Sequence, residues 1–314
     1  MGKFVSFTME KISKCLEPVE LRRFKNHFPE YPPLFIIGPP RTGTTLLYQL
    51  MVHGFELSYF SNLANMFHMS SCIVSAWGKR ALRGYRSDFK SDFGFVKGFM
   101  APHEGAKIWN RWFPTEQREG FHYAGEGYLG EKAKSEIRRV VGGMERIFKA
   151  PFINKNVKNS VRIRALVEIF PDALFLQLKR DPIQVAFSIL AARKRNCKNV
   201  NDWWSVMPKE IHIIKHKGYV EQVCGQVFYI EKDIEEDINF VGGDKRLVLS
   251  YEEICLSPKN AFGLIRSFLN ARGIPLKKKR QIPNSFPLSK KDVDLDSFEK
   301  KELKKVLGQL YEEQ

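Results

Sequence analysis

LFIIGPPRTGTTLLYQLMV, residues 34–52, is the most informative segment of the chain. Its first four residues are wholly apolar, which is typical of a strand covered on both faces, as in a parallel sheet. Gly38 and Gly43 bracket the loop that follows, and residues 44–52 have a helical composition. A glycine loop between a strand and a helix can cradle a phosphate, because its backbone N–H groups and the positive helix end face the anion.

The loop differs from one that hydrolyses triphosphates. Such a loop carries a Lys at the position of Thr44, followed by a hydroxyl that binds Mg²⁺. Thr44 therefore favours a phosphate that is not part of a magnesium-bound triphosphate, with Arg41 as the fixed cation, and no metal is expected. The candidate phosphate-binding residues are Pro40, Arg41, Thr42, Gly43, Thr44 and Thr45.

The same order of elements returns along the chain. Expected strands at 151–154, 173–178 and 246–250 are followed by expected helices at 160–170, 182–193 and 258–271. This alternation predicts an α/β fold, a three-layer parallel sheet with helices on both faces and a topology like that of P-loop nucleotide hydrolases. We expect a single domain over 1–314, with an N-terminal helical segment (1–30), a catalytic core (31–285) and a C-terminal helix (296–314). An aromatic-rich insertion occupies 55–150.

The charge balance points to an anionic partner. The 51 Lys and Arg exceed the 35 Asp and Glu, giving a net charge of +16. A nucleotide, an acidic glycan or lipid, or a nucleic acid fits such a field, although a dispersed basic surface that aids solubility would give the same number.

The cysteines and the hydropathy of the chain indicate where in the cell the protein is expected. The five cysteines contain no CxxC pair, which argues against a disulfide framework and a zinc knuckle and favours a cytoplasmic location. The start lacks the apolar run of a signal peptide, and no segment is long and apolar enough for a membrane span. We expect no stable membrane insertion, which leaves room for a peripheral contact.

A second motif follows the expected strand at 173–178. Residues 170–182 read FPDALFLQLKRDP, so Arg180 would leave the sheet at its carboxyl edge and Ser188 would lie two turns along the next helix. This segment resembles the 3′-phosphate motif of sulfotransferases that use 3′-phosphoadenosine-5′-phosphosulfate (PAPS). In that family the corresponding Arg and Ser hold the 3′-phosphate.

The glycine loop resembles the same family. FIIGPPRTGTTLL (35–47) is similar to its 5′-phosphosulfate loop, in the variant found in tyrosylprotein sulfotransferases and in many bacterial carbohydrate or lipid sulfotransferases. Tyr251-Glu252-Glu253-Ile254 is similar to the family's Tyr-Glu-Asp-Leu segment, whose Tyr lies near the adenine. The resemblance covers roughly 33–269, although most of the insertion is unmatched.

The resemblance also suggests catalytic residues. Lys155 stands where cytosolic members carry a catalytic Lys, but Asn156 follows it where they carry a His. The Glu that tyrosylprotein sulfotransferases use is also absent. The remaining candidates for the general base are His103 and Glu104, within the insertion. His53 and Glu56 are the reserve candidates for the general base.

Two histidines have the spacing of metal ligands. His212 and His216 have metal-ligand spacing on an expected helix, but no Glu lies between them, so we interpret them as a surface pair.

The resemblance implies transfer of a sulfuryl group from PAPS to a hydroxyl of a small-molecule or glycan acceptor, with adenosine 3′,5′-bisphosphate (PAP) as product. A carbohydrate or glycolipid acceptor is favoured, because sugar faces stack on the rings of the insertion, and a phenol is the alternative acceptor. The alternatives are a P-loop nucleoside-phosphate kinase or other NTPase, and a non-enzymatic basic nucleic-acid-binding protein. The preferred function needs no nucleic acid, and the sequence assigns no oligomeric state.

Overall fold

A four-stranded parallel sheet forms the centre of the molecule. The structure, a computed structural model, describes residues 3–113, 121–289 and 295–312. The strands are β1 (Leu34–Ile37), β2 (Ile153–Lys155), β3 (Leu174–Lys179) and β4 (Arg246–Ser250), in the order β2-β1-β3-β4. Because all pairs are parallel, every strand ends at the same edge of the sheet. The α/β prediction and its parallel sheet are confirmed.

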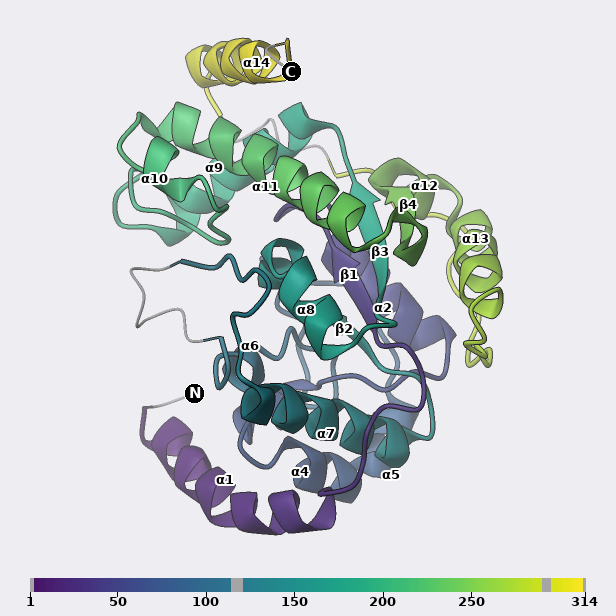
Figure 1. The fold of residues 1–314 in the computed structure, drawn as a ribbon. Helices are drawn as coiled ribbons and strands as arrows, with labels where there is room; N and C mark the ends of the chain where they lie inside the picture. The colour runs from purple at the N-terminus through teal and green to yellow at the C-terminus, as the bar shows by residue number, and fades with distance from the viewer. Residues whose placement is uncertain (1–2, 114–120, 290–294, 313–314) are drawn as a thin grey trace.

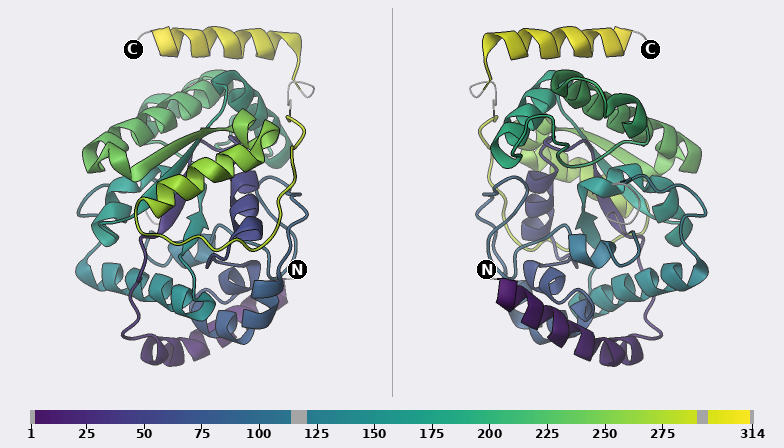
Figure 2. Two further views of the ribbon diagram at one scale, coloured as in Figure 1. Left: turned by 90° about the vertical axis from the view of Figure 1, so that its right-hand side faces the viewer. Right: turned by 90° about the vertical axis from the view of Figure 1, so that its left-hand side faces the viewer.

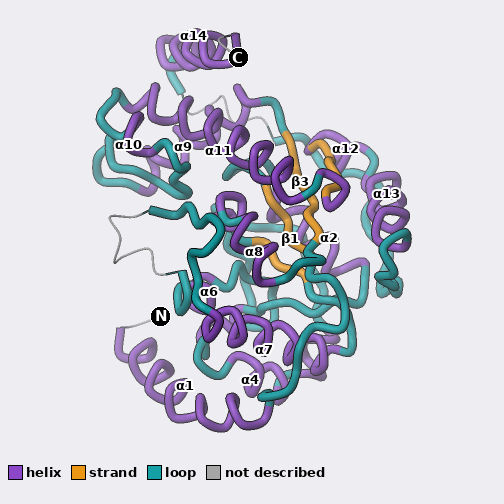
Figure 3. Tube along the Cα trace, in the orientation of Figure 1, coloured by secondary structure: helices purple, strands orange, loops and turns teal. Residues whose placement is uncertain are grey.

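Helices cover both faces of this sheet, and Figure 3 shows the strands enclosed among them. In Figure 1, α8 and α11 lie on one face, and α2, α12 and α13 on the other. The bounds of these and the remaining helices are α1 (Lys3–Arg23), α2 (Thr44–Gly54), α3 (Asn62–Met66), α4 (Ser71–Trp77), α5 (Lys79–Gly84), α6 (Ala106–Trp109), α7 (Glu131–Phe148), η1 (Val157–Val161), α8 (Ile163–Ile169), α9 (Pro182–Asn196), α10 (Ile211–Ile214), α11 (Tyr219–Val241), η2 (Gly243–Lys245), α12 (Tyr251–Leu256), α13 (Pro258–Asn270) and α14 (Ser297–Glu312).

Local sequence explains why the chain turns from strand to helix at the functional edge. β1 is buried along its whole length, as its apolar run predicts. After β3, the Asp181 carboxylate accepts a hydrogen bond from the Ile183 N–H at 2.9 Å and caps α9. Pro182 occupies the first turn of that helix, where a missing N–H costs nothing.

Two sequence-based expectations need correction. The helix expected at 160–170 is divided into the 3₁₀ segment η1 and the shorter helix α8. His212 lies in the four-residue helix α10, and His216 lies beyond its end, so the two do not share one long helix. No cluster of three or more His, Cys, Asp or Glu side chains within the described ranges could hold a metal ion.

The insertion forms a helical layer beyond β2. Helices α3–α7 occupy it, and some of its rings, Trp109 and Phe113 among them, are buried in the core. Others are half-buried or exposed, and of these Phe89 and Phe93 line the cleft described below. No helix in the described part of the chain combines the length and the apolar character that crossing a bilayer requires.

Candidate active site

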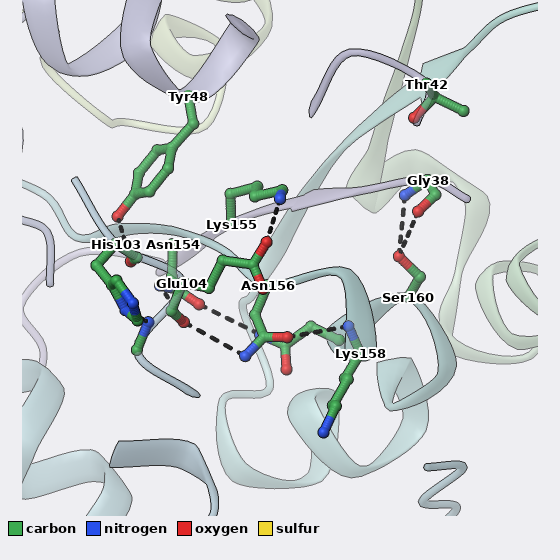
Figure 4. A network of polar contacts seen from close by, with 12 residues as sticks. Gly38, Thr42, Tyr48, His103, Glu104, Asn154, Lys155, Asn156, Lys158 and Ser160 are labelled. Atoms are coloured by element: carbon green, nitrogen blue, oxygen red, sulfur yellow. Dashed lines mark hydrogen bonds and ion pairs between the residues drawn. The ribbon is translucent and has the colours of Figure 1, made fainter. Parts of the chain in front are cut away.

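The phosphate loop is fixed at both ends by contacts with distant segments. The Ser160 hydroxyl accepts from the Gly38 N–H at 3.0 Å and lies 2.9 Å from the Gly38 carbonyl oxygen (Figure 4). Gly43 has φ 94°, and a Cβ there would stand 2.4 Å from the Tyr251 ring. Gly43 therefore allows both the left-handed turn and the close approach of Tyr251.

Arg41, Ser188 and Arg180 form one cationic site at the carboxyl edge of the sheet. Arg41 Nε donates to Ser188 Oγ at 3.0 Å, and Arg180 Nη1 donates to the Arg41 carbonyl oxygen at 3.1 Å. Burial, and then the charge of Arg180, lower the pKa of the Arg41 guanidinium. Arg180 Nε is buried and has no partner among the described residues. Two close cations and an unpartnered buried donor fit an anion with several acceptor oxygens, such as a phosphate.

Tyr251 links this cationic site to the C-terminal part of the chain. The Arg180 guanidinium carbon lies 4.3 Å from the centroid of the Tyr251 ring. The Tyr251 hydroxyl accepts from the Ser289 N–H at 3.1 Å, and Arg180 Nη2 donates to the Ser289 carbonyl. Residues 286–289 therefore form a wall beside the two side chains predicted to contact the nucleotide.

These residues line one open cleft of about 670 Å³. It contains every predicted site residue except Thr42 and His103. The predicted site residues that line it are Pro40, Arg41, Gly43, Thr44, Thr45, Glu104, Lys155, Arg180, Ser188 and Tyr251.

Thr42 and His103 are engaged elsewhere. The Thr42 hydroxyl is buried and donates to the Pro39 carbonyl at 2.9 Å, so it shapes the loop from within. His103 Nδ1 accepts from the Gly105 N–H at 2.8 Å, and burial lowers the pKa of this imidazole. Neither side chain faces the cleft.

The reserve candidates also lie outside the cleft lining. His53 Nε2 lies 3.1 Å from the Gln281 carbonyl oxygen, while His53 Nδ1 accepts from the Ser87 N–H at 3.2 Å. Burial lowers the pKa of His53. Glu56 is exposed, and its N–H donates to the Lys277 carbonyl at 2.9 Å.

Lys155 and Glu104 form an ion pair inside the cleft (Figure 4). Lys155 ends β2 and is only 3% exposed. Glu104 arrives from the insertion, and its main-chain carbonyl accepts from Asn154 Nδ2 and Asn156 Nδ2, each at 3.3 Å. Trp109 Nε1 donates to Asn154 Oδ1 at 3.0 Å and orients that amide. The two amides flanking Lys155 thus hold the carboxylate beside it.

A tight turn at 92–95 completes the cleft and was not predicted. Asp92 and Phe95 exchange main-chain hydrogen bonds of 2.9 and 2.8 Å, and Phe93 and Gly94 between them have φ of 45° and 90°. A Cβ on Gly94 would lie 3.6–3.7 Å from Thr45 Oγ1, Glu104 Oε1 and Lys155 Nζ. The Asp-x-Gly spacing at 92–94 is a turn signal that sequence reasoning could have used.

The fold and the site define an α/β enzyme of the phosphate-loop class, with anion-binding side chains at the carboxyl edge of a parallel sheet. The model of the sulfotransferase family matches residues 32–274, and the chain belongs to that family. Membership implies PAPS as the sulfuryl donor. This assignment replaces the kinase and the nucleic-acid-binding alternatives.

Solved structures agree with the fold. Sulfotransferase STF9 from Mycobacterium avium superposes with a TM-score of 0.55 at 16% identity, covering 93% of this chain and 72% of that one. Sulfotransferase STF1 from Mycobacterium tuberculosis H37Rv gives a TM-score of 0.52 at 13% identity, covering 88% and 78%. No curated protein matches the chain by sequence. At these identities the likeness concerns the fold alone.

Proposed function

We propose that the chain transfers the sulfuryl group of PAPS to a hydroxyl of a carbohydrate or glycolipid, with Lys155 and Glu104 as the catalytic pair. The observation that carries this proposal is the Lys155–Glu104 ion pair, which lies in the same cleft as Arg41 and Arg180. A cation for the leaving phosphate and a base for the acceptor are therefore adjacent.

The nucleotide is assigned to the cationic end of the cleft. The main-chain N–H groups of the loop and Arg41 hold the 5′-phosphate, while Arg180 and Ser188 hold the 3′-phosphate. Tyr251 then contacts the adenine. The unpartnered Nε of Arg180 supports this assignment, because a phosphate oxygen would satisfy it.

The proton and the electron pair each have a destination. Glu104, paired with a cation, is an ionised acceptor and takes the proton of the attacking hydroxyl. The bond from the acceptor oxygen to sulfur forms as the bond from sulfur to the 5′-phosphate oxygen breaks, and that phosphate oxygen keeps the electron pair. Lys155, no longer paired once Glu104 is protonated, stabilises the new charge on the leaving phosphate.

The rings of the cleft support the proposed acceptor class. Phe89, Phe93 and Trp204 line it, and the Phe93 and Trp204 centroids are 6.4 Å apart. Rings of this kind stack on sugar faces, which supports a carbohydrate or glycolipid. All five cysteines are free thiols, which supports the proposed cytoplasmic location.

The direct test is transfer of radiolabelled sulfate from PAPS to a panel of glycans and glycolipids. We expect labelled product with the wild type and a rate lower by roughly a hundredfold or more with Glu104→Gln, since the amide cannot take the proton. Transfer of the labelled sulfate to phenols but not to sugars would overturn the proposed acceptor class. An unchanged rate in the variant would overturn the role of Glu104.

A further inference from the structure

A second groove lies outside the reaction cleft, between α13 and the chain segment that follows it. Its volume is about 410 Å³, and the end of α2 contributes the rest of its wall. We call it the basic groove, because its lining includes Lys259, Arg266, Lys278 and Arg280. No Asp or Glu is among the described residues that line it.

The cations of the basic groove lack acidic partners. In the described ranges, Lys259, Arg266 and Lys278 form no ion pair. The Arg280 guanidinium donates to the main-chain carbonyls of Tyr85 at 2.8 Å and Gly84 at 3.2 Å. These bonds fix the guanidinium in place and leave its charge uncompensated.

Lys279, the neighbour of Arg280, shows the same excess of positive charge. Its Nζ donates to the Val52 carbonyl at 3.3 Å. Burial, and then the charge of Arg280, lower the pKa of Lys279 to about 8, although Glu56 acts in the opposite direction. Positive charge is therefore crowded here, and an anion would relieve it.

The floor of the basic groove is apolar. Phe55 and Phe262 stack with centroids 4.8 Å apart and ring planes at 14°, and Ile282 lies beside them. A cationic rim above such a floor suits a ligand that carries anionic groups on an uncharged ring framework. Because the wall is concave, it fits a ligand chain that enters the groove better than it fits the flat surface of a membrane.

The basic groove and the reaction cleft share one segment of chain, residues 277–289. Phe55 and Lys278 form an antiparallel bridge that fixes its start. Asn284 lines the basic groove, and Phe286 lines the reaction cleft. Two residues span at most about 7 Å, so the two hollows are neighbours. In the left view of Figure 2 this yellow-green segment passes beneath α13 before it rises toward α14.

We propose that the basic groove binds acidic groups, sulfate or carboxylate, of the glycan whose hydroxyl enters the reaction cleft. This inference rests on the proposed function and extends it, because it makes the acceptor an anionic oligosaccharide. Lys259 and Arg266 on α13 and Lys278 on the segment contact the acidic groups. Phe262 and Phe55 underlie the sugar framework.

The test measures binding of a heparin-derived hexasaccharide by isothermal titration calorimetry, with PAP present. The groove variant is Lys259→Ala/Arg266→Ala, both exposed positions on α13. The matched control is Lys301→Ala/Lys304→Ala, two exposed lysines on α14 whose loss changes the net charge equally. We expect roughly tenfold weaker binding in the groove variant, since two charged contacts are lost, and no change in the control.

Three outcomes would overturn the inference: no binding by the wild type, equal binding by the groove variant, or equal loss in both variants. A fourth contrary outcome is that the protein binds phosphatidylserine vesicles through Lys259 and Arg266 but does not bind the hexasaccharide. Stabilisation by PAP is measured in parallel on all three proteins. If PAP does not stabilise the wild type, the proposed function itself is in question. If PAP does stabilise it and the hexasaccharide does not bind as expected, only the inference about the basic groove is wrong.

Discussion

Arg180 donates from Nη1 to the main-chain carbonyl of Arg41 at 3.1 Å, although the two residues lie 139 positions apart in the chain. This contact joins the phosphate loop after β1 to the strand end of β3. It brings the two arginines to one side of the cleft, and Arg41 is the middle residue of the hydrogen-bond chain, because its Nε donates to Ser188 Oγ and its carbonyl accepts from Arg180. A ligand with two phosphates can therefore meet both motifs at once.

Arg180→Ala is expected to weaken PAP binding by roughly a hundredfold, because about two charge-assisted hydrogen bonds are lost. The variant also loses the bonds to the Arg41 and Ser289 carbonyls, which costs about 1–2 kcal/mol of unfolding free energy. Calorimetric titration and urea denaturation separate the two effects. Equal PAP affinity in the variant would remove Arg180 from the nucleotide site.

Gly94→Ala is expected to lower kcat by roughly tenfold or more while PAP still binds. The added methyl group would stand beside Thr45, Glu104 and Lys155, where the proposed mechanism places the sulfuryl group. Gly98→Ala is the matched control, because Gly98 also has a positive φ (104°) but has no neighbour within 4 Å of its Cβ position. Equal kcat loss in both variants would attribute the effect to backbone strain.

Asn156→Ala is expected to reduce kcat by roughly tenfold through Glu104, since the variant loses one of the two amide donors to the Glu104 carbonyl. Asn156 is not among the residues that line the cleft, so we expect it to position Glu104 and not to contact the substrate. Steady-state kinetics and urea denaturation test this role together, because a displaced Glu104 lowers kcat while the KM for PAPS stays unchanged. A lower unfolding free energy with an unchanged kcat would show that Asn156 acts only on stability.

His122 predicts a loss of stability in acid. Burial, the largest cause, lowers its pKa to about 3, and its Nδ1 accepts from the Met207 N–H at 2.9 Å. His122 in the unfolded chain binds a proton as the pH falls below about 6.5, whereas His122 in the folded chain stays neutral. The free energy of unfolding therefore falls as the pH falls. The contribution is about 2 kcal/mol at pH ~5.

Urea denaturation at several pH values measures this. His122→Asn keeps an acceptor near the Met207 N–H, so its unfolding free energy should fall about 2 kcal/mol less between pH ~7.5 and pH ~5 than that of the wild type. Parallel pH curves for the two proteins would refute the assignment.

That Arg41, Arg180 and Ser188 meet at one edge of the sheet could be predicted from the sequence, because each motif is local. The glycine loop and Arg180 both follow apolar runs, and parallel strands bring such junctions to one edge without further information. The helix expected at 160–170 was less accurate, since the chain forms the tight segment η1 before α8 begins.

The end of the cleft that holds Lys155 and Glu104 depends on contacts that no local pattern encodes. Glu104 reaches Lys155 across 51 residues because the amides of Asn154 and Asn156 hold its main chain. His103 was predicted with equal weight, yet a bond from the Gly105 N–H engages its ring, and adjacent residues need not face the same way. The place of the Phe93–Gly94 turn is likewise set by tertiary packing, with the Phe93 ring centroid 5.3 Å from the Arg41 guanidinium carbon.

The central claim is that the cationic site formed by Arg41, Arg180 and Ser188 holds a doubly phosphorylated adenosine without a metal. Calorimetric titration of the wild-type protein with PAP in the presence of a chelator tests it most directly. We expect one site per chain, with binding far tighter than that of adenosine 5′-monophosphate, because the 3′-phosphate contacts Arg180 and Ser188. Equal affinity for the two nucleotides, or binding only of ATP with Mg²⁺, would contradict the account.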